Sequence, residues 1–200
     1  MKKILVLLLL VAVAFGIYWF KFRKTERNSG PKQQPLQVNK HSAAFNATMD
    51  SLINCYLNIK NSLVEADTAK TKTACRELIQ LSDSSKFMEL KKDTVGIFTS
   101  AVAQLDNIKS NAESLLKQSD ITEIRRDFSM ISESIYPLLK TIHYEGKTLF
   151  WQNCPMAFND EEGANWINET SEIINPYLGK HHPTYKAAML NCGDIKDSIK

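Results

Sequence analysis

Two cysteines in the last fifty residues each lie close to a methionine. Cys154 is followed by Met156, and Cys192 is preceded by Met189. Thiolate and thioether sulfur atoms are soft ligands, which select Cu(I) over harder ions. Pro155 and the turn-forming residues 175–177 should fold the two halves of this tail back on each other. If the four side chains converge in that way, they predict a site for one Cu(I) or Ag(I) ion.

The sequence also allows two other chemical states for the same two cysteines. An exported pair can form a disulfide, provided that the α-carbons of Cys154 and Cys192 come within about 6–7 Å. The pair can also remain as two packed thiols in an apolar interior. A metal site and a disulfide are compatible, because a dithiol that binds Cu(I) when reduced can oxidise when empty. The sequence leaves these alternatives open.

Two adjacent histidines, His181 and His182, precede Met189 in the same tail. Their imidazole nitrogens make them candidates for auxiliary metal ligands or for the capture of Cu(II). Adjacent residues point apart on any regular element. An exposed loop pair without a ligand is therefore the competing interpretation.

Motifs of enzymatic chemistry are missing from the sequence. It contains no Gly-rich phosphate loop, no Gly-x-Ser-x-Gly and no His-Glu-x-x-His. The other two cysteines, Cys55 and Cys75, fit no zinc or haem spacing. They would either staple two neighbouring helices or pack as small core residues. We therefore expect a protein that is not an enzyme.

The residues before the tail predict the helical scaffold that positions it. Apolar side chains recur at three- and four-residue steps over about 42–65, 67–81, 93–117 and 120–142. Asp67 and Asp120 suit helix N-caps, and Pro137 should kink or split the fourth helix. Four amphipathic helices with short connections predict a mainly α protein built as an antiparallel four-helix bundle.

After Gly146 the helical periodicity stops. We expect a short strand over 147–151, a turn over 159–163 and a helical turn over 169–174. Together these segments predict a small irregular C-terminal lobe that packs on the bundle. This lobe can include a short β-strand.

An apolar run from Ile4 to Phe20 follows a basic start. The small-x-small residues 12–14 fit a cleaved signal peptide, whereas the continuation of the run through two aromatic residues fits an uncleaved membrane anchor. We favour an anchor over residues 1–24. A polar linker over 25–40 and the helical domain over 41–200 would follow it.

The basic charge of the chain belongs to this first segment. Five of the 25 lysines and arginines lie in residues 1–24, which hold no acid, so the remainder has 20 basic and 22 acidic side chains. A remainder with this balance has no positive surplus with which to hold a phosphate backbone. We therefore expect no nucleic-acid partner.

The sequence from about Phe45 to Gly193 resembles the bacterial domain of unknown function 3347. The resemblance rests on residues of the first and fourth helices and on a C-terminal motif: Tyr56, Leu57, Lys60 and Leu63; Arg125, Phe128 and Ser132; Cys154 to Phe158, Gly163, Trp166, Asn175 to Tyr177, Gly179, Met189, Leu190, Cys192 and Gly193. The sequence departs from that motif at Asn165 and in a longer loop over 181–185.

Members of that family occur as stand-alone exported proteins and as extensions of periplasmic adaptors in copper and silver efflux. The resemblance implies a location in the cell envelope on the periplasmic side, either anchored to the inner membrane or secreted. It also implies a heavy-metal efflux adaptor or a copper-handling protein as the partner.

Arg125 lies beside the apolar stripe of the fourth predicted helix. Its planar guanidinium can hold a carboxylate or several carbonyl oxygens at once. We expect Arg125 to bind a carboxylate or the backbone carbonyls of the C-terminal tail.

Overall fold

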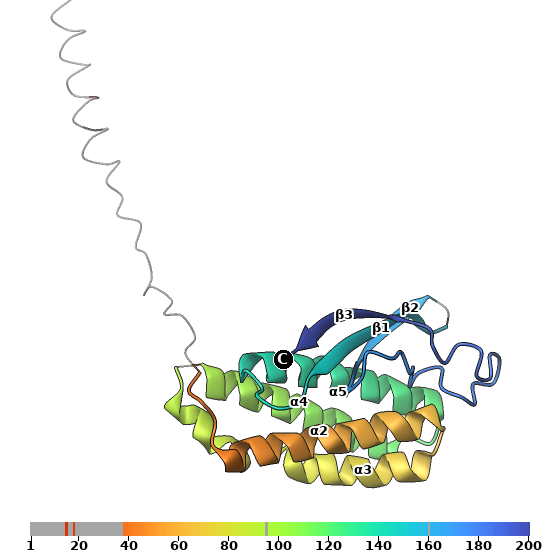
Figure 1. Cartoon of the computed structure of the whole chain (residues 1–200), viewed down its shortest axis with the longest axis horizontal. Helices are drawn as coiled ribbons and strands as arrows, with labels where there is room; N and C mark the ends of the chain where they lie inside the picture. Colours follow the sequence, from red (N-terminus) through yellow and green to blue (C-terminus); the bar gives the residue numbers. More distant parts are fainter. Residues whose placement is uncertain (1–14, 16–17, 19–37, 95, 160) are drawn as a thin grey trace, which may run out of the picture. The chain divides into compact units, whose positions relative to one another are not determined.

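The computed structural model describes residues 15, 18, 38–94, 96–159 and 161–200 (Figure 1). The chain divides into two compact units, Met1–Pro35 and Leu36–Lys200, and the second contains all the elements described below. The expected anchor over 1–24 and most of the expected linker over 25–40 lie outside the described residues. Within the described ranges, no helix is long and apolar enough to span a bilayer.

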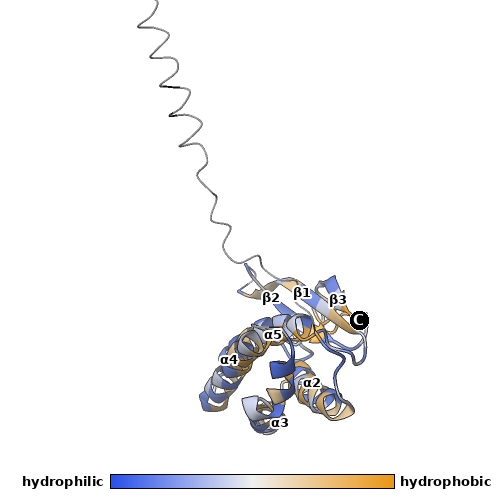
Figure 2. Ribbon diagram, turned by 90° about the vertical axis from the view of Figure 1, so that its left-hand side faces the viewer, coloured by the Kyte–Doolittle hydropathy of each residue, from blue (hydrophilic) through white to orange (hydrophobic). Residues whose placement is uncertain are grey.

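The domain is mainly helical, as the periodicity predicts. Its helices are α2 (Ala43–Val64), α3 (Thr68–Leu81), the 3-10 helix η1 (Ser84–Lys92), α4 (Ile97–Lys117) and α5 (Ile121–Thr141). Consecutive long helices pack on one another, α2 on α3, α3 on α4 and α4 on α5. Viewed end on, α5 lies next to the sheet and α3 lies farthest from it (Figure 2).

Acidic and hydroxyl side chains cap the helices where the sequence indicates. The Asp67 carboxylate accepts a hydrogen bond from the Lys70 amide at 3.0 Å. The Asp120 carboxylate accepts bonds from the Thr122 and Glu123 amides. Each cap satisfies backbone N–H groups that have no partner in the first helical turn.

Two helical predictions need correction in detail. Of the two alternatives for Pro137, a kink or a split of the fourth helix, the structure excludes the split, because α5 continues through the proline to Thr141. The proline lies in the last turns of the helix, and the fully buried neighbours Ile135 and Leu138 hold that end in the core. The third long helix begins at Ile97 rather than near 93, because η1 and a turn occupy the preceding residues.

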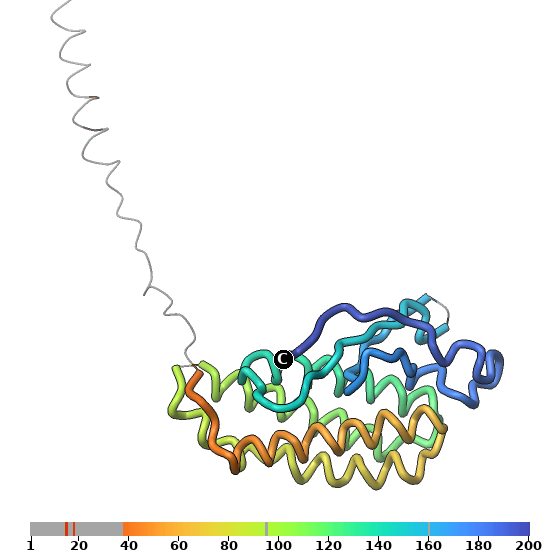
Figure 3. Tube along the Cα trace, in the orientation of Figure 1, coloured from red at the N-terminus to blue at the C-terminus, as the bar shows by residue number. Residues whose placement is uncertain are grey.

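The C-terminal part is more regular than expected. It forms an antiparallel sheet of β1 (Leu149–Phe158), β2 (Glu162–Asn168) and β3 (Asp194–Ile199), in the order β2-β1-β3. β1 is therefore the central strand, and Trp151 lies opposite both Ile167 and Asp197. The chain leaves the sheet after β2 and passes through the segment 169–193, which we call the tail loop, before it returns as β3 (Figure 3).

The helical turn expected over 169–174 is absent, and that segment forms bends. Hydrogen bonds from side-chain amides take the place of helical backbone hydrogen bonds there. Asn168 donates to the Glu172 carbonyl at 2.8 Å, and Gln152 donates to the carbonyls of Thr170 and Glu172. With these carbonyl oxygens satisfied by side chains, the backbone does not need helical hydrogen bonds.

Candidate functional site

The two faces of the sheet have different partners. Trp151 of β1 stacks on Tyr136 of α5, with the ring centroids 4.4 Å apart. Successive strand residues point to opposite faces, so Gln152 and Cys154 lie on the other face. The tail loop covers that face, since Gln152 bonds its carbonyls and Cys154 meets Cys192. We call this the thiol face.

The thiol face brings two of the predicted site residues together. The sulfur atoms of Cys154 and Cys192 are 2.8 Å apart, and both cysteines are free thiols. Cys154 is fully buried, and Cys192 is partly buried. Burial raises the pKa of the Cys192 thiol to about 12, and its hydrogen bond with Cys154 adds to the effect. The Cys192 thiol is therefore protonated at neutral pH and lies in contact with Cys154 beneath the tail loop.

The two predicted methionine ligands pack against the same core as the thiols. Met156 and Met189 are both partly buried, like Cys192. Met156 follows Cys154 on β1, where the register between β1 and β2 shifts. Met189 accepts a hydrogen bond at its carbonyl from the Cys192 amide at 3.0 Å, so these two residues occupy one backbone turn.

The histidine pair has a different environment. His181 is exposed, and its Nε2 lies 3.8 Å from a carboxylate oxygen of Glu65, which also pairs with Lys180. The Nδ1 atom of His182 accepts hydrogen bonds from the Thr184 and Tyr185 amides at 3.3 and 3.2 Å. These contacts tie the histidines to the end of α2 and to their own loop. Among the described residues, no group of three or more His, Cys, Asp or Glu side chains is arranged to hold a metal ion.

The remaining cysteines are unpaired core residues. Cys55 donates to a Glu77 carboxylate oxygen at 3.5 Å, and Cys75 donates to the Ala112 carbonyl at 3.3 Å. Burial raises the pKa of Cys55 to about 11 and that of Cys75 to about 12. Of the two alternatives for this pair, the structure has the packed thiols and not the staple.

Arg125 clamps the tail loop to the helices, as its position in the sequence predicts. Its Nε donates to the Pro176 carbonyl at 3.0 Å, and its second terminal nitrogen donates to the Leu63 carbonyl at 3.2 Å. The side chain is almost fully buried, and burial lowers the pKa of the guanidinium to about 10. Arg125 therefore stays charged at neutral pH and joins the end of α2 to the turn over 175–179.

Two residues of the tail, Asn175 and Gly193, position Cys192. Asn175 is fully buried, and its Nδ2 donates to the Cys192 carbonyl at 2.9 Å. Gly193 has a φ of +141°, and a Cβ there would lie 2.6 Å from the Asn153 carbonyl oxygen and 3.0 Å from Trp166. Only glycine lets the chain press this closely against β1. The Asn-Pro-Tyr sequence is the signal that marks Asn175, but it does not reveal the contact with Cys192.

Two buried polar atoms on the thiol face have no hydrogen-bond partner among the residues that the structure describes. They are Oε1 of Gln152, an acceptor, and Nε1 of Trp166, a donor. The two residues are cross-strand partners, so their side chains leave the sheet on the same face. Such atoms are costly in a purely structural core, and native proteins retain them mostly where a redox role, a bound ion or a water accounts for them.

A buried lysine adjoins the start of the tail loop. Lys60 on α2 is 2% exposed and donates from Nζ to the Asn168 side-chain oxygen at 2.9 Å. Burial lowers the pKa of Lys60 to about 8, against the charges of Glu169 and Glu172, which raise it. The resemblance to the family includes Lys60. Its spacing from Tyr56 and Leu63 puts it on the buried stripe of α2, although the residue type by itself favours a solvated position.

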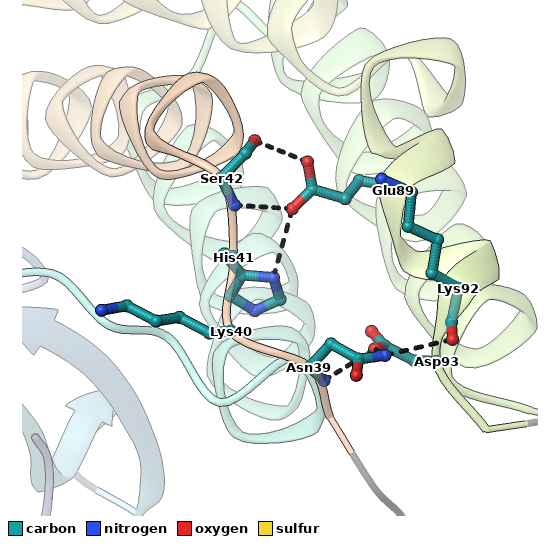
Figure 4. A pocket seen from close by; sticks show the side chains of 7 residues that line it. All are labelled: Asn39, Lys40, His41, Ser42, Glu89, Lys92 and Asp93. Carbon is teal, nitrogen blue, oxygen red and sulfur yellow. Dashed lines mark hydrogen bonds and ion pairs between the residues drawn. The ribbon is translucent and has the colours of Figure 1, made fainter.

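One surface hollow of the domain is lined by residues that form hydrogen bonds with one another. The hollow of Figure 4 has a volume of about 260 Å³, and its lining comes from Asn39–Ser42 and from Glu89, Lys92 and Asp93. Ser42 donates to Glu89 through its amide at 2.7 Å and through its hydroxyl at 2.5 Å. Asn39 likewise donates to Asp93. These hydrogen bonds connect the start of α2 to η1 and its C-terminal end, so we assign the residues around this hollow a structural role.

A second hollow, of about 590 Å³, lies between α2 and α3. Most of the exposed lining area is apolar, although the lining residues include the carboxylates of Glu65, Asp67 and Glu77. Lys70 pairs with Asp67 at 3.1 Å, and Glu65 pairs with Lys180. The thiol face, with its contacting sulfur atoms, is therefore the stronger candidate for a functional site.

A family profile matches part of the chain. The profile described as "Protein of unknown function (DUF3347)" covers residues 52–147, from within α2 to the residues before β1. The matched range includes Lys60 and Arg125, and it ends before Cys154. No curated protein and no solved structure shows a significant match to the chain.

Proposed function

Because this chain belongs to the DUF3347 family, whose description assigns no activity, we propose a function from the thiol face itself. The protein binds one soft monovalent metal ion, Cu(I) or Ag(I), between Cys154 and Cys192. The observation that carries this proposal is the 2.8 Å contact between two reduced sulfur atoms on segments 38 residues apart in sequence.

The chemistry of the pair favours a soft, low-coordinate ion. Two thiolates, with no third His, Cys, Asp or Glu grouped with them in the described part of the chain, suit Cu(I) or Ag(I), because zinc sites almost always use four ligands. Met156 and Met189, each within three residues of a cysteine in the sequence, are the proposed sources of a thioether sulfur for a third contact. His181 and His182, with their own contacts near Glu65, have only a subsidiary role in this proposal.

Metal binding must displace protons from the thiols. Because the pKa of Cys192 is raised to about 12, this thiol is protonated at neutral pH and releases its proton when its sulfur binds the metal. The apparent affinity therefore rises with pH. Cys154 is fully buried, so the tail loop must move for an ion to enter or leave.

The wider setting of the site is part of the same proposal. We infer that α2, α3, α4 and α5 form an antiparallel four-helix bundle that serves as a rigid base for the sheet and the tail loop. Residues 1–24 anchor or export the protein, and the domain lies in the cell envelope on the periplasmic side. A heavy-metal efflux adaptor or a copper-handling protein receives or supplies the ion, and the protein itself is not an enzyme.

A second candidate function is a structural or protein-interaction module without metal. The sulfur contact also favours this candidate, because a disulfide between Cys154 and Cys192 needs a sulfur separation of about 2.05 Å. In that case the bond would staple the tail loop to β1, and the function would depend on a protein partner.

Competition for Cu(I) separates the two candidates. We expect the reduced full-length protein to take one equivalent of Cu(I) from a colorimetric chelator, and Cys154→Ser to abolish this binding. Cys55→Ser is the matched control, because it removes a buried thiol from α2 and should bind as the parent does. Met156→Leu nearly preserves volume, so it should weaken binding and leave the fold intact.

Equal binding by the parent and Cys154→Ser would remove the thiol pair from the site. A parent that binds nothing under reducing conditions would leave the structural module as the function.

A further inference from the structure

Cys192 lies on a part of the chain that no sheet ladder or helix holds in place. The residues before it form turns, and β3 begins only at Asp194. The Cys192 amide bonds locally to the Met189 carbonyl, which does not fix its distance from β1. On the C-terminal side, the close approach of Gly193 to β1 and the Asn153–Asp194 pair limit the distance of Cys192 from β1. On the N-terminal side, contacts within the tail loop must do so.

Asn175 supplies two of those contacts. Its side-chain Nδ2 donates to the Cys192 carbonyl at 2.9 Å, and its backbone amide donates to the Leu190 carbonyl at 2.8 Å. The side-chain Oδ1 accepts from the Tyr177 and Leu178 amides at 2.8 and 3.1 Å. A fully buried amide that uses both its donor and its acceptor in this way has one stable orientation.

The turn that contains Asn175 is itself fixed to the helices. Arg125 bonds the Pro176 carbonyl, and the Lys180 amide donates to the Val64 carbonyl at 2.8 Å. A continuous set of hydrogen bonds thus runs from α5 and the end of α2, through Asn175, to the backbone of Cys192.

We propose that Asn175 is a positioning residue that holds Cys192 opposite Cys154 and thereby sets the thiol–disulfide equilibrium of the pair. This inference deepens the proposed metal site and rests on it for its biological use. The equilibrium itself is a property of the two thiols and exists without metal. When the pair oxidises, the two thiols lose two electrons and two protons as the S–S bond forms. Glutathione disulfide accepts them and becomes two glutathione molecules.

The test measures this equilibrium in metal-free protein. The background is the full-length chain with Cys55→Ser and Cys75→Ser, so only the thiol pair can react. Samples equilibrate in glutathione buffers of graded ratio, alkylation traps the free thiols, and mass spectrometry gives the oxidised fraction. We expect Asn175→Ala to lower the equilibrium constant for disulfide formation about fivefold, as loss of its hydrogen bond to the Cys192 carbonyl implies.

Asn175→Asp is the second variant. It keeps the two acceptor bonds to Tyr177 and Leu178 but cannot donate to Cys192, so we expect a shift in the same direction. It decides the question if Asn175→Ala does not fold.

Two controls separate positioning from general loosening. Asn191→Ala removes a comparable amide bond, from Asn191 to the Ile173 carbonyl at 2.7 Å, one residue from Cys192. Leu78→Ala destabilises the core on α3. Both should leave the equilibrium constant within twofold of the parent, and Leu78→Ala should lower only the melting temperature.

Parent-like equilibria in both Asn175 variants would overturn the inference. An equal shift in either control would also overturn it, because the effect would then be unspecific. Failure of Cu(I) binding would refute the proposed function and leave this result intact, since no metal is present.

Discussion

Closure of the Cys154–Cys192 disulfide should stabilise the domain strongly. The two residues are 38 positions apart, and their sulfur atoms already lie 2.8 Å apart, so closure needs little movement of the folded chain. The loss of chain entropy in the unfolded state then stabilises the fold by about 4 kcal/mol. For a domain of this size, that free energy corresponds to a rise in melting temperature of about 8–16 °C.

Differential scanning calorimetry of the oxidised and the reduced full-length protein measures this rise. Cys154→Ser cannot close the bond, so it should melt at one temperature under both conditions. Cys55→Ser removes a thiol outside the pair and should show the full rise. An oxidised parent that melts at or below the reduced protein would refute the reasoning, because it would mean that closure strains the tail loop.

Three further substitutions test the contacts around the site. Arg125→Lys should cost about 1–3 kcal/mol and speed proteolysis of the tail loop, because it removes the fork that holds two buried carbonyls. Arg126→Lys alters surface ion pairs and a cation–π contact with Phe158 but no buried carbonyl, so it should change stability by no more than about 1 kcal/mol in the same urea titrations. Gly193→Ala should lower the melting temperature more than Gly96→Ala, since both have a positive φ but only Gly193 meets atoms within 4 Å. Lys60→Met should raise stability relative to the parent at pH 7, and this gain should shrink as the pH rises from about 8 to about 10.5.

The sign of the Lys60 effect follows from its lowered pKa. Between a folded-state pKa of about 8 and an unfolded-state value of about 10.5, the unfolded chain binds more protons, so the parent gains stability as the pH rises. Below pH 8 the folded state carries a buried charge at its full cost. A gain from Lys60→Met that stays constant across this range would show that the ammonium group is solvated in the folded protein.

The helices could be predicted from the sequence because each buries one apolar stripe. Phe45, Met49, Leu52 and Tyr56 recur at helical spacing, and all are buried on α2. The capping residues Asp67 and Asp120 mark the starts of α3 and α5 for the same local reason. Local signals of this kind do not depend on distant parts of the chain.

The sheet was harder to predict because its pairing is not local. β3, with the sequence Asp-Ile-Lys-Asp-Ser-Ile, pairs with β1 from about forty residues away and is largely exposed. Its polar composition resembles a surface loop. Pro155 inside β1 also argues against a central strand, although it lies where the register shifts and is exposed.

The candidate site was predicted by residue type and only in part by position. Cysteine chemistry marks Cys154 and Cys192, and the structure brings them into contact. The same chemistry marks His181 and His182, which instead have contacts near Glu65 and within their own loop. The contact between Asn175 and Cys192 depends on how the tail loop folds, and no local pattern in the sequence contains that information.

Titration of a chain that retains only the thiol pair tests the central claim most directly. In the Cys55→Ser, Cys75→Ser variant, Cys154 and Cys192 are the remaining thiols, and competition with a Cu(I) chelator under reducing conditions counts the bound equivalents. The proposed site predicts one equivalent, with an affinity that rises with pH as the thiols release protons. A chain that binds no Cu(I), or that binds it equally well after the pair is oxidised, would contradict the metal site.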